Sequence, residues 1–110
     1  MGARYLEHAF DSESLDMLVI AFCKDYGRRK REIEAGRIRK RIIMEYEYLN
    51  ARVSEAATEI VGDIGETYIN EIGNRIGYAK SVVPDISESE YKRNKIAVKL
   101  NVARKLHLID

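Results

Sequence analysis

The amino-acid sequence predicts an all-α fold, a small bundle of about four helices with one long central helix. The 110-residue chain contains one proline and seven glycines, so few residues interrupt helices. Apolar residues recur in steps of three and four along most of the chain, as they do on one face of a helix. Hydrophobic residues make up 45% of the sequence and charged residues 34%, which is typical of a folded protein. The length fits a single helical domain over residues 1–110.

The first predicted helix begins at a cap formed by Ser12 or Ser14 and runs to residue 35, and Gly36 ends it. Residues 1–11 show no clear periodicity and are predicted to form a poorly ordered N-terminal arm. The apolar face of the helix consists of Leu15, Leu18, Val19, Phe22 and Tyr26. Residues 28–31 read RRKR, and the simplest interpretation of this run is a solvated helix end.

The central helix is the clearest element of the sequence. Its apolar residues follow one another in steps of 4, 4, 3, 4, 3 and 4, close to a heptad repeat. They are Ile38, Ile42, Tyr46, Leu49, Val53, Ala56 and Ile60. This seam fits a homodimer through residues 38–60 as well as it fits packing within one chain. The sequence leaves both alternatives open.

Two helices follow in the last third of the chain. Gly62 and Gly65 bracket a break, and a short helix is predicted from Gly65 to a stop at Gly77. A loop over residues 78–85 leads to the last helix, which begins at Ser87 because Ser87 and Glu90 form an S-x-x-E capping box. Its core stripe is predicted to be Tyr91, Val98, Val102 and Leu106. The short helix, the glycine and the loop make residues 68–110 resemble a helix-turn-helix unit.

Catalytic chemistry is not indicated. The two histidines, His8 and His107, lie near opposite ends, and no phosphate-binding or nucleophile motif is present. We therefore expect no enzyme, no metal site and no cofactor. The single Cys23 excludes an internal disulfide and is expected to be a small core residue in a reducing compartment. No stretch approaches the ~20 apolar residues of a membrane span, so we expect a cytoplasmic protein without membrane contact.

Charge is segregated along the chain, although the net charge is only +1. Residues 1–23, 24–41, 42–77 and 78–110 carry −3, +6, −5 and +3. In the last helix the basic residues share a face that differs from the core stripe. This face consists of Ser89, Lys92, Arg93, Lys95 and Lys99. It can be a solvated surface, or it can enter the major groove of double-stranded DNA with its early side chains on base edges.

The last helix carries a further signal in its order of residues. A Ser-Glu start, an aromatic residue, basic residues and a closing V-A-x-x-L-x-L-I resemble the C-terminal segment of ArpU/RinA-type phage transcriptional regulators. The matching positions are Ser87, Glu88, Tyr91, Lys92, Arg93, Lys95, Ala97, Val102, Ala103, Leu106, Leu108 and Ile109. The stretch EIGNRIGY at 71–78 is similar to the opening of their sigma-region-4-like helix-turn-helix. The insertion AKSVVPDI departs from the family, whose turn is shorter.

This resemblance covers residues 68–110 and implies a DNA-binding transcriptional regulator of phage or mobile-element genes. Ser89, Lys92, Arg93 and Lys95 would contact DNA. Residues 1–67 would provide dimerisation or a contact to RNA polymerase. Secondary phosphate contacts would come from Arg28, Arg29, Lys30 and Arg31.

The alternative is a non-enzymatic helical interaction protein. Such a protein would be a phage-encoded inhibitor of a host protein or nuclease that uses the acidic central helix as its docking face. It would otherwise be a small structural or packaging component that assembles through the heptad-like seam.

Overall fold

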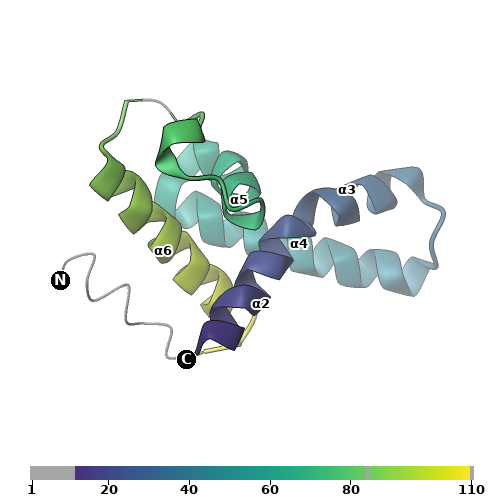
Figure 1. Cartoon of the computed structure of the whole chain (residues 1–110). Coiled ribbons are helices and arrows are strands. Elements are labelled where there is room, and N and C mark those ends of the chain that lie inside the picture. Colours follow the sequence, from purple (N-terminus) through teal and green to yellow (C-terminus); the bar gives the residue numbers. More distant parts are fainter. Residues whose placement is uncertain (1–11, 84, 110) are drawn as a thin grey trace.

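The computed structural model describes residues 12–83 and 85–109, so the predicted arm at residues 1–11 lies outside it. Throughout these described residues the chain forms helices and no strand, which confirms the all-α prediction (Figure 1). In chain order the elements are α2 (Glu13–Lys24), α3 (Tyr26–Ala35), α4 (Lys40–Val61), the 3-10 turn η1 (Gly62–Ile64), α5 (Gly65–Gly73), the 3-10 turn η2 (Tyr78–Lys80) and α6 (Glu88–Lys105).

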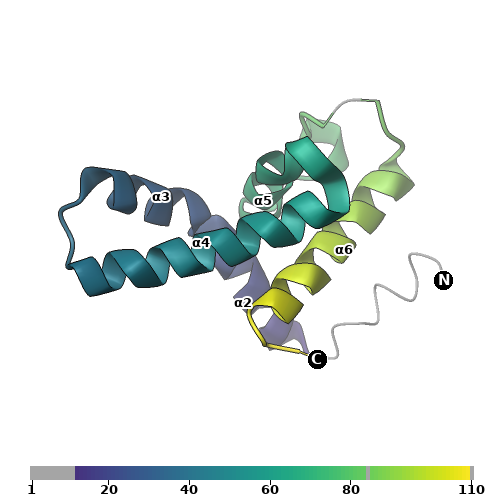
Figure 2. The ribbon, with the colours of Figure 1, turned by 180° about the vertical axis from the view of Figure 1, so that it is seen from behind.

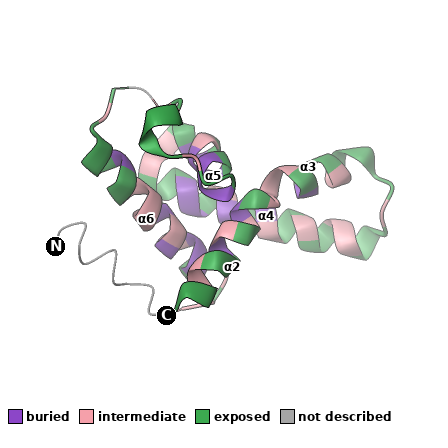
Figure 3. Ribbon diagram, in the orientation of Figure 1, coloured by how far each residue is buried: buried purple, intermediate pink, exposed green. Residues whose placement is uncertain are grey.

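The hydrophobic core lies where α2, α4, α5 and α6 meet, and the buried residues gather there (Figure 3). It consists of Val19, Cys23, Val53, Ala56, Ala57, Tyr68, Ile69, Ile72, Tyr91, Val98, Val102 and Ala103. Helix α3 and the N-terminal half of α4 project from this core as a two-helix arm (Figures 1 and 2). Of the ten residues of α3, only Arg29 is buried. The arm therefore rests on few core contacts.

The first predicted helix is broken at Asp25, so the prediction of one helix over residues 12–35 is wrong. Two polar side chains bind carbonyl groups on either side of the break. Arg29 donates to the carbonyl of Phe22 at 2.8 Å and to Oδ1 of Asn50 at 2.7 Å, and Asn50 donates to the carbonyl of Tyr26 at 3.1 Å. Carbonyl groups beside the break thus receive hydrogen bonds from side chains, which offsets the free-energy cost of burying them. Periodicity cannot reveal this, because Asn50 comes from α4.

The ends of the helices agree with the sequence at several points. Ser12 accepts a hydrogen bond from the amide of Leu15, and Ser87 accepts one from the amide of Glu90, both at 3.2 Å. Gly36 ends α3 in the left-handed conformation, with φ of 65°. Each of these residues was predicted to begin or end a helix.

The seam of the central helix is used within the chain along its C-terminal half. Val53 and Ala56 are fully buried in the core, where α4 packs against α5 and α6. Ile38, Ile42 and Tyr46 are only half-buried in the arm. Ile60 is 41% exposed, so its assignment to the buried seam is wrong. Val61, the next residue, packs against the core instead, and Gly62 ends the helix directly after it with φ of 69°.

Helix α5 ends at Gly73, and the prediction that it continues to Gly77 is wrong. Arg75 takes the left-handed position with φ of 55°, and the amide of Ile76 donates back to the carbonyl of Glu71 at 2.9 Å. This 6→1 bond is the usual helix-ending arrangement, with arginine in the place of glycine. The connection to α6 consequently spans residues 74–87, which is longer than a helix-turn-helix turn.

Candidate nucleic-acid interface

The first turns of α6 present three of the residues predicted to contact DNA. Ser89, Lys92 and Arg93 are exposed, and Lys92 forms an ion pair with Glu88 at 2.8 Å. The cap at Ser87 fixes the start of the helix, and the burial of Tyr91 fixes its rotation. Glu88 and Glu90 lie in the same turn. The charge of this end of α6 is therefore balanced rather than strongly basic.

Lys95 and Lys99 lie on the inward side of α6, apart from the other three. Lys95 donates to the carbonyl of Ile76 at 2.8 Å, and its ammonium lies 5.1 Å from the centre of the Tyr91 ring. Lys99 pairs with Asp16 of α2 at 2.8 Å, and its side chain is 18% exposed. The sequence placed all five residues on one outward face, and the structure separates them into two groups.

The run at residues 28–31 is also divided. Arg29 is 3% exposed and holds the break between α2 and α3, so the expectation of four solvated cations is wrong for this residue. Burial lowers the pKa of its guanidinium group. Arg28 pairs with Asp25 at 3.1 Å, and Lys30 pairs with Glu66 at 3.4 Å. Arg28, Lys30 and Arg31 remain exposed.

These exposed cations border a polar hollow of about 380 Å³ between α3 and α5. Lys24 of α2 joins them on its wall, and Asn70 and Asn74 of α5 supply amide groups on the other side. The amide of Asn74 donates to both oxygens of Asn70 at 2.9 Å. Glu66 is the acidic residue of this wall. Cations and amides in one concave surface suit contacts to phosphate oxygens.

A second hollow, of about 190 Å³, lies on the other side of the crossing between α2 and α5. Arg75, Lys95 and Lys99 provide three cations around it. The pKa of Lys95 is lowered, first by burial and then by the charge of Lys99. Both hollows reach the end of α5, where Asn74 lines the first and Arg75 lines the second.

The two hollows lie on either side of the close contact between α2 and α5. A Cβ atom on Gly73 would lie 2.5 Å from the backbone Cα and N of Lys24, so only glycine allows this approach. Glu71 holds the connection that follows. Its carboxylate, 1% exposed, accepts from Ser81 at 2.6 Å, from the amide of Val82 at 2.9 Å and from the Tyr91 hydroxyl at 2.7 Å.

Sequence reasoning missed Lys24, Arg75, Glu71 and Asn50. A signal existed for Glu71, which stands three residues after Tyr68 and beside Ile72 on the apolar face of its helix. A charged residue on such a face indicates a buried partner. Arg75 and Lys24 gave no signal, because they join the other cations only through the crossing of two helices.

Cys23 is buried, as predicted, and burial raises the pKa of its thiol to about 12. Over residues 12–83 and 85–109, no group of histidine, cysteine and acidic residues has the arrangement of a metal site. Within the same part of the chain, no helix combines the length and apolar character needed to cross a membrane. Comparison with protein-family models, curated proteins and solved structures finds no match to this chain.

Proposed function

We propose that this protein is a DNA-binding transcriptional regulator of phage or mobile-element genes. The observation that carries the proposal is the pair of hollows with basic residues on either side of the crossing between α2 and α5. They collect cations from α2, α3, α6 and the end of α5 around one helix crossing. Segments far apart in sequence thus contribute cations to two hollows, and cations of this kind can bind phosphate groups.

In this proposal the two hollows and the first turns of α6 have different tasks. The hollows hold the DNA backbone through Lys24, Lys30, Arg31 and Arg75. The exposed first turns of α6 approach base edges with the side chains that the resemblance implies, Ser89, Lys92 and Arg93. Lys95 acts from within the second hollow, and Lys99 steadies α6 against α2. Contact with RNA polymerase stays a prediction from the resemblance.

Binding to duplex DNA at several salt concentrations tests the proposal, with fluorescence anisotropy as the readout. One charge-reversal variant carries Lys24→Glu, Arg31→Glu and Arg75→Glu at exposed positions of the hollows. We expect its log affinity to depend less steeply on log salt, by about one unit for each phosphate group that the variant no longer binds.

The matched control carries Arg37→Glu, Arg39→Glu and Arg104→Glu, which are also exposed but line neither hollow. It changes the net charge by the same amount. Equal loss of affinity in both variants would mean that only overall charge matters, and the hollows would not be the interface. No binding of the unaltered protein to duplexes selected from a random pool at low salt would end the proposal.

A second candidate function is the non-enzymatic helical interaction protein. The observation in its favour is a strip of exposed apolar side chains on α4, which includes Met44 and Tyr48. Such a strip suits a protein surface better than it suits DNA. Affinity capture from nuclease-treated host lysate separates the candidates. An inhibitor would retain its host partner after the DNA is removed, whereas a regulator held only through DNA would not.

A further inference from the structure

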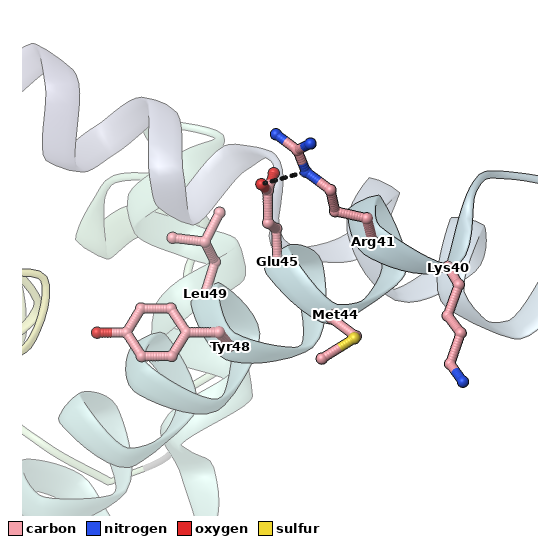
Figure 4. Close-up of a pocket in the computed structure, with 6 residues that line it drawn as sticks. All are labelled: Lys40, Arg41, Met44, Glu45, Tyr48 and Leu49. Carbon is pink, nitrogen blue, oxygen red and sulfur yellow. Dashed lines mark ion pairs between the residues drawn. The ribbon is translucent and has the colours of Figure 1, made fainter.

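The most exposed large apolar side chains of the arm lie on α4, away from the core. Met44 is 60% exposed and Tyr48 50% exposed, and with Leu49 they border an open hollow of about 710 Å³ (Figure 4). Lys40, Arg41 and Glu45 frame it, and Glu45 pairs with Arg41 at 4.0 Å. An apolar surface with a charged rim is the usual composition of a protein–protein contact.

The same apolar surface continues onto α2. A smaller hollow of about 220 Å³ shares Leu49 and is lined by Leu18, Phe22 and Tyr46. Leu18 is itself 44% exposed. The groove between α2 and the arm thus presents several apolar side chains from two helices, more than the scattered single residues found on any surface.

Within the described part of the chain, the arm also lacks a third layer. In both views, α3 is the one described helix that lies along the N-terminal half of α4, and it covers a single side (Figures 1 and 2). Two paired helices without a further element bury little apolar surface. The strip centred on Tyr48 faces away from the buried residues Asn50, Val53 and Ala57 of the same helix. Apart from Leu49, which borders both, it is therefore distinct from the seam that the sequence suggested for dimerisation.

The charges along this strip have an order that selects its partner. Residues 41, 44, 45, 48, 52 and 55 share one face of α4, since they recur at 3, 4 and 7 positions. Their charges are positive at Arg41, negative at Glu45, positive at Arg52 and negative at Glu55. If a second α4 packs antiparallel to the first with Tyr48 opposite Tyr48, opposite charges come together. Residue 41 of one helix then faces residue 55 of the other, and residue 45 lies beside residue 52.

We propose that the occupant of this strip is a second copy of the chain, whose α4 packs antiparallel to the first with Tyr48 at the two-fold axis. Arg41 then pairs with Glu55 of the second copy, and Glu45 with Arg52 of the second copy, while Met44 and Tyr48 are buried between them. A parallel pair would set Arg41 against Arg41 and Glu55 against Glu55. Within one chain Arg41 already pairs with Glu45 and Arg52 with Glu55, so the dimer exchanges these ion pairs, and the order of the charges selects its direction. This dimer does not depend on DNA binding.

Sedimentation equilibrium of the full chain tests the proposal through charge reversal. In the antiparallel dimer, Arg41→Glu alone or Glu55→Arg alone creates two like-charge contacts. We expect each to weaken dimerisation about tenfold or more. The double variant with both changes in one chain regains the unaltered affinity, as does an equimolar mixture of the two single variants. A parallel dimer predicts no loss in the single variants, and that result would overturn the orientation.

Disulfide trapping gives an independent readout. A cysteine introduced by Tyr48→Cys lies at the two-fold axis, so it forms a covalent dimer on mild oxidation. A cysteine introduced by Met44→Cys lies far from its own copy and links instead to an Arg52→Cys chain in a mixture. Cys23 is 2% exposed and does not compete. Faster linking of Met44→Cys to itself, or a monomer at every concentration of the unaltered chain, would refute the proposal. Unchanged helicity by circular dichroism shows that the variants fold.

Discussion

The hydroxyl of Tyr91 in α6 donates to the carboxylate of Glu71 in α5 at 2.7 Å, inside the core. The same hydroxyl lies 3.0 Å from the carbonyl of Ile76, and the same carboxylate receives Ser81 and the amide of Val82. One buried charge thus links two helices and the connection between them. The long connection is held in one conformation although it contains little regular structure.

We predict that Glu71→Gln lowers the free energy of unfolding by about 2 kcal/mol, because hydrogen bonds to a buried charged acceptor are worth more than those to an amide. Urea unfolding followed by circular dichroism measures the loss. The control is Glu66→Gln on the same helix, where the carboxylate is exposed and its removal should cost less than about 0.5 kcal/mol. Equal losses in both variants would contradict the importance of the buried network.

The same carboxylate makes stability depend on pH. Burial raises the pKa of Glu71, but the hydrogen bonds from Ser81, Val82 and Tyr91 lower it more, and the net pKa lies below its ordinary value of 4.5. The stabilisation is therefore fully present above that value and is lost as the pH falls through the lower pKa of the folded state. We expect the difference in stability between the unaltered protein and Glu71→Gln to shrink in acid. A difference that stays constant from neutral pH into strong acid would contradict it.

Arg29 is predicted to be a structural residue. Replacement by alanine leaves Oδ1 of Asn50 and the carbonyl of Phe22 without their donor, which should cost roughly 3 kcal/mol. The neighbouring Arg28→Ala removes an exposed ion pair and should cost less than about 1 kcal/mol. Thermal unfolding compares the two. If the two variants melt together, the break between α2 and α3 does not rely on Arg29.

Gly73→Ala should destabilise the protein by roughly 2 kcal/mol or more, because the added carbon meets the backbone of Lys24 at 2.5 Å and forces α2 and α5 apart. Gly77→Ala is the matched control: no atom lies within 4 Å of its added carbon, and its φ of −86° suits any residue. We expect that change to be neutral or to stabilise by about 0.5 kcal/mol. The midpoints of urea unfolding measure both changes. An unchanged midpoint for Gly73→Ala would mean that α2 and α5 can move apart at their crossing without loss of stability.

The sequence predicted those structural features that depend on residues close together in the chain. The caps at Ser12 and Ser87 and the stripe through Tyr91, Val98 and Val102 are local patterns, and the structure confirms them. The break at Asp25 depends on Asn50, which lies 21 positions beyond the Arg29 it binds. No local pattern contains that information.

The candidate site shows the same limit. A face drawn from periodicity alone grouped Lys95 and Lys99 with Arg93, because all three avoid the core stripe. Their contacts with Ile76 and Asp16 come from other elements, which periodicity cannot place. The gathering of Lys24, Arg75 and Lys95 around one crossing required the fold itself.

The ion pair between Asp16 and Lys99 joins residues 83 positions apart, the first helix of the described chain and the last. Helix α6 also supplies Tyr91, Val98 and Val102 to the core that α2 and α4 share. We therefore expect the apolar faces of the earlier helices to stay uncovered during synthesis until α6 is available to pack against them. Accordingly, we expect folding to be completed only when α6 is available, and a nascent chain stalled before residue 88 to be a substrate for chaperones and proteases.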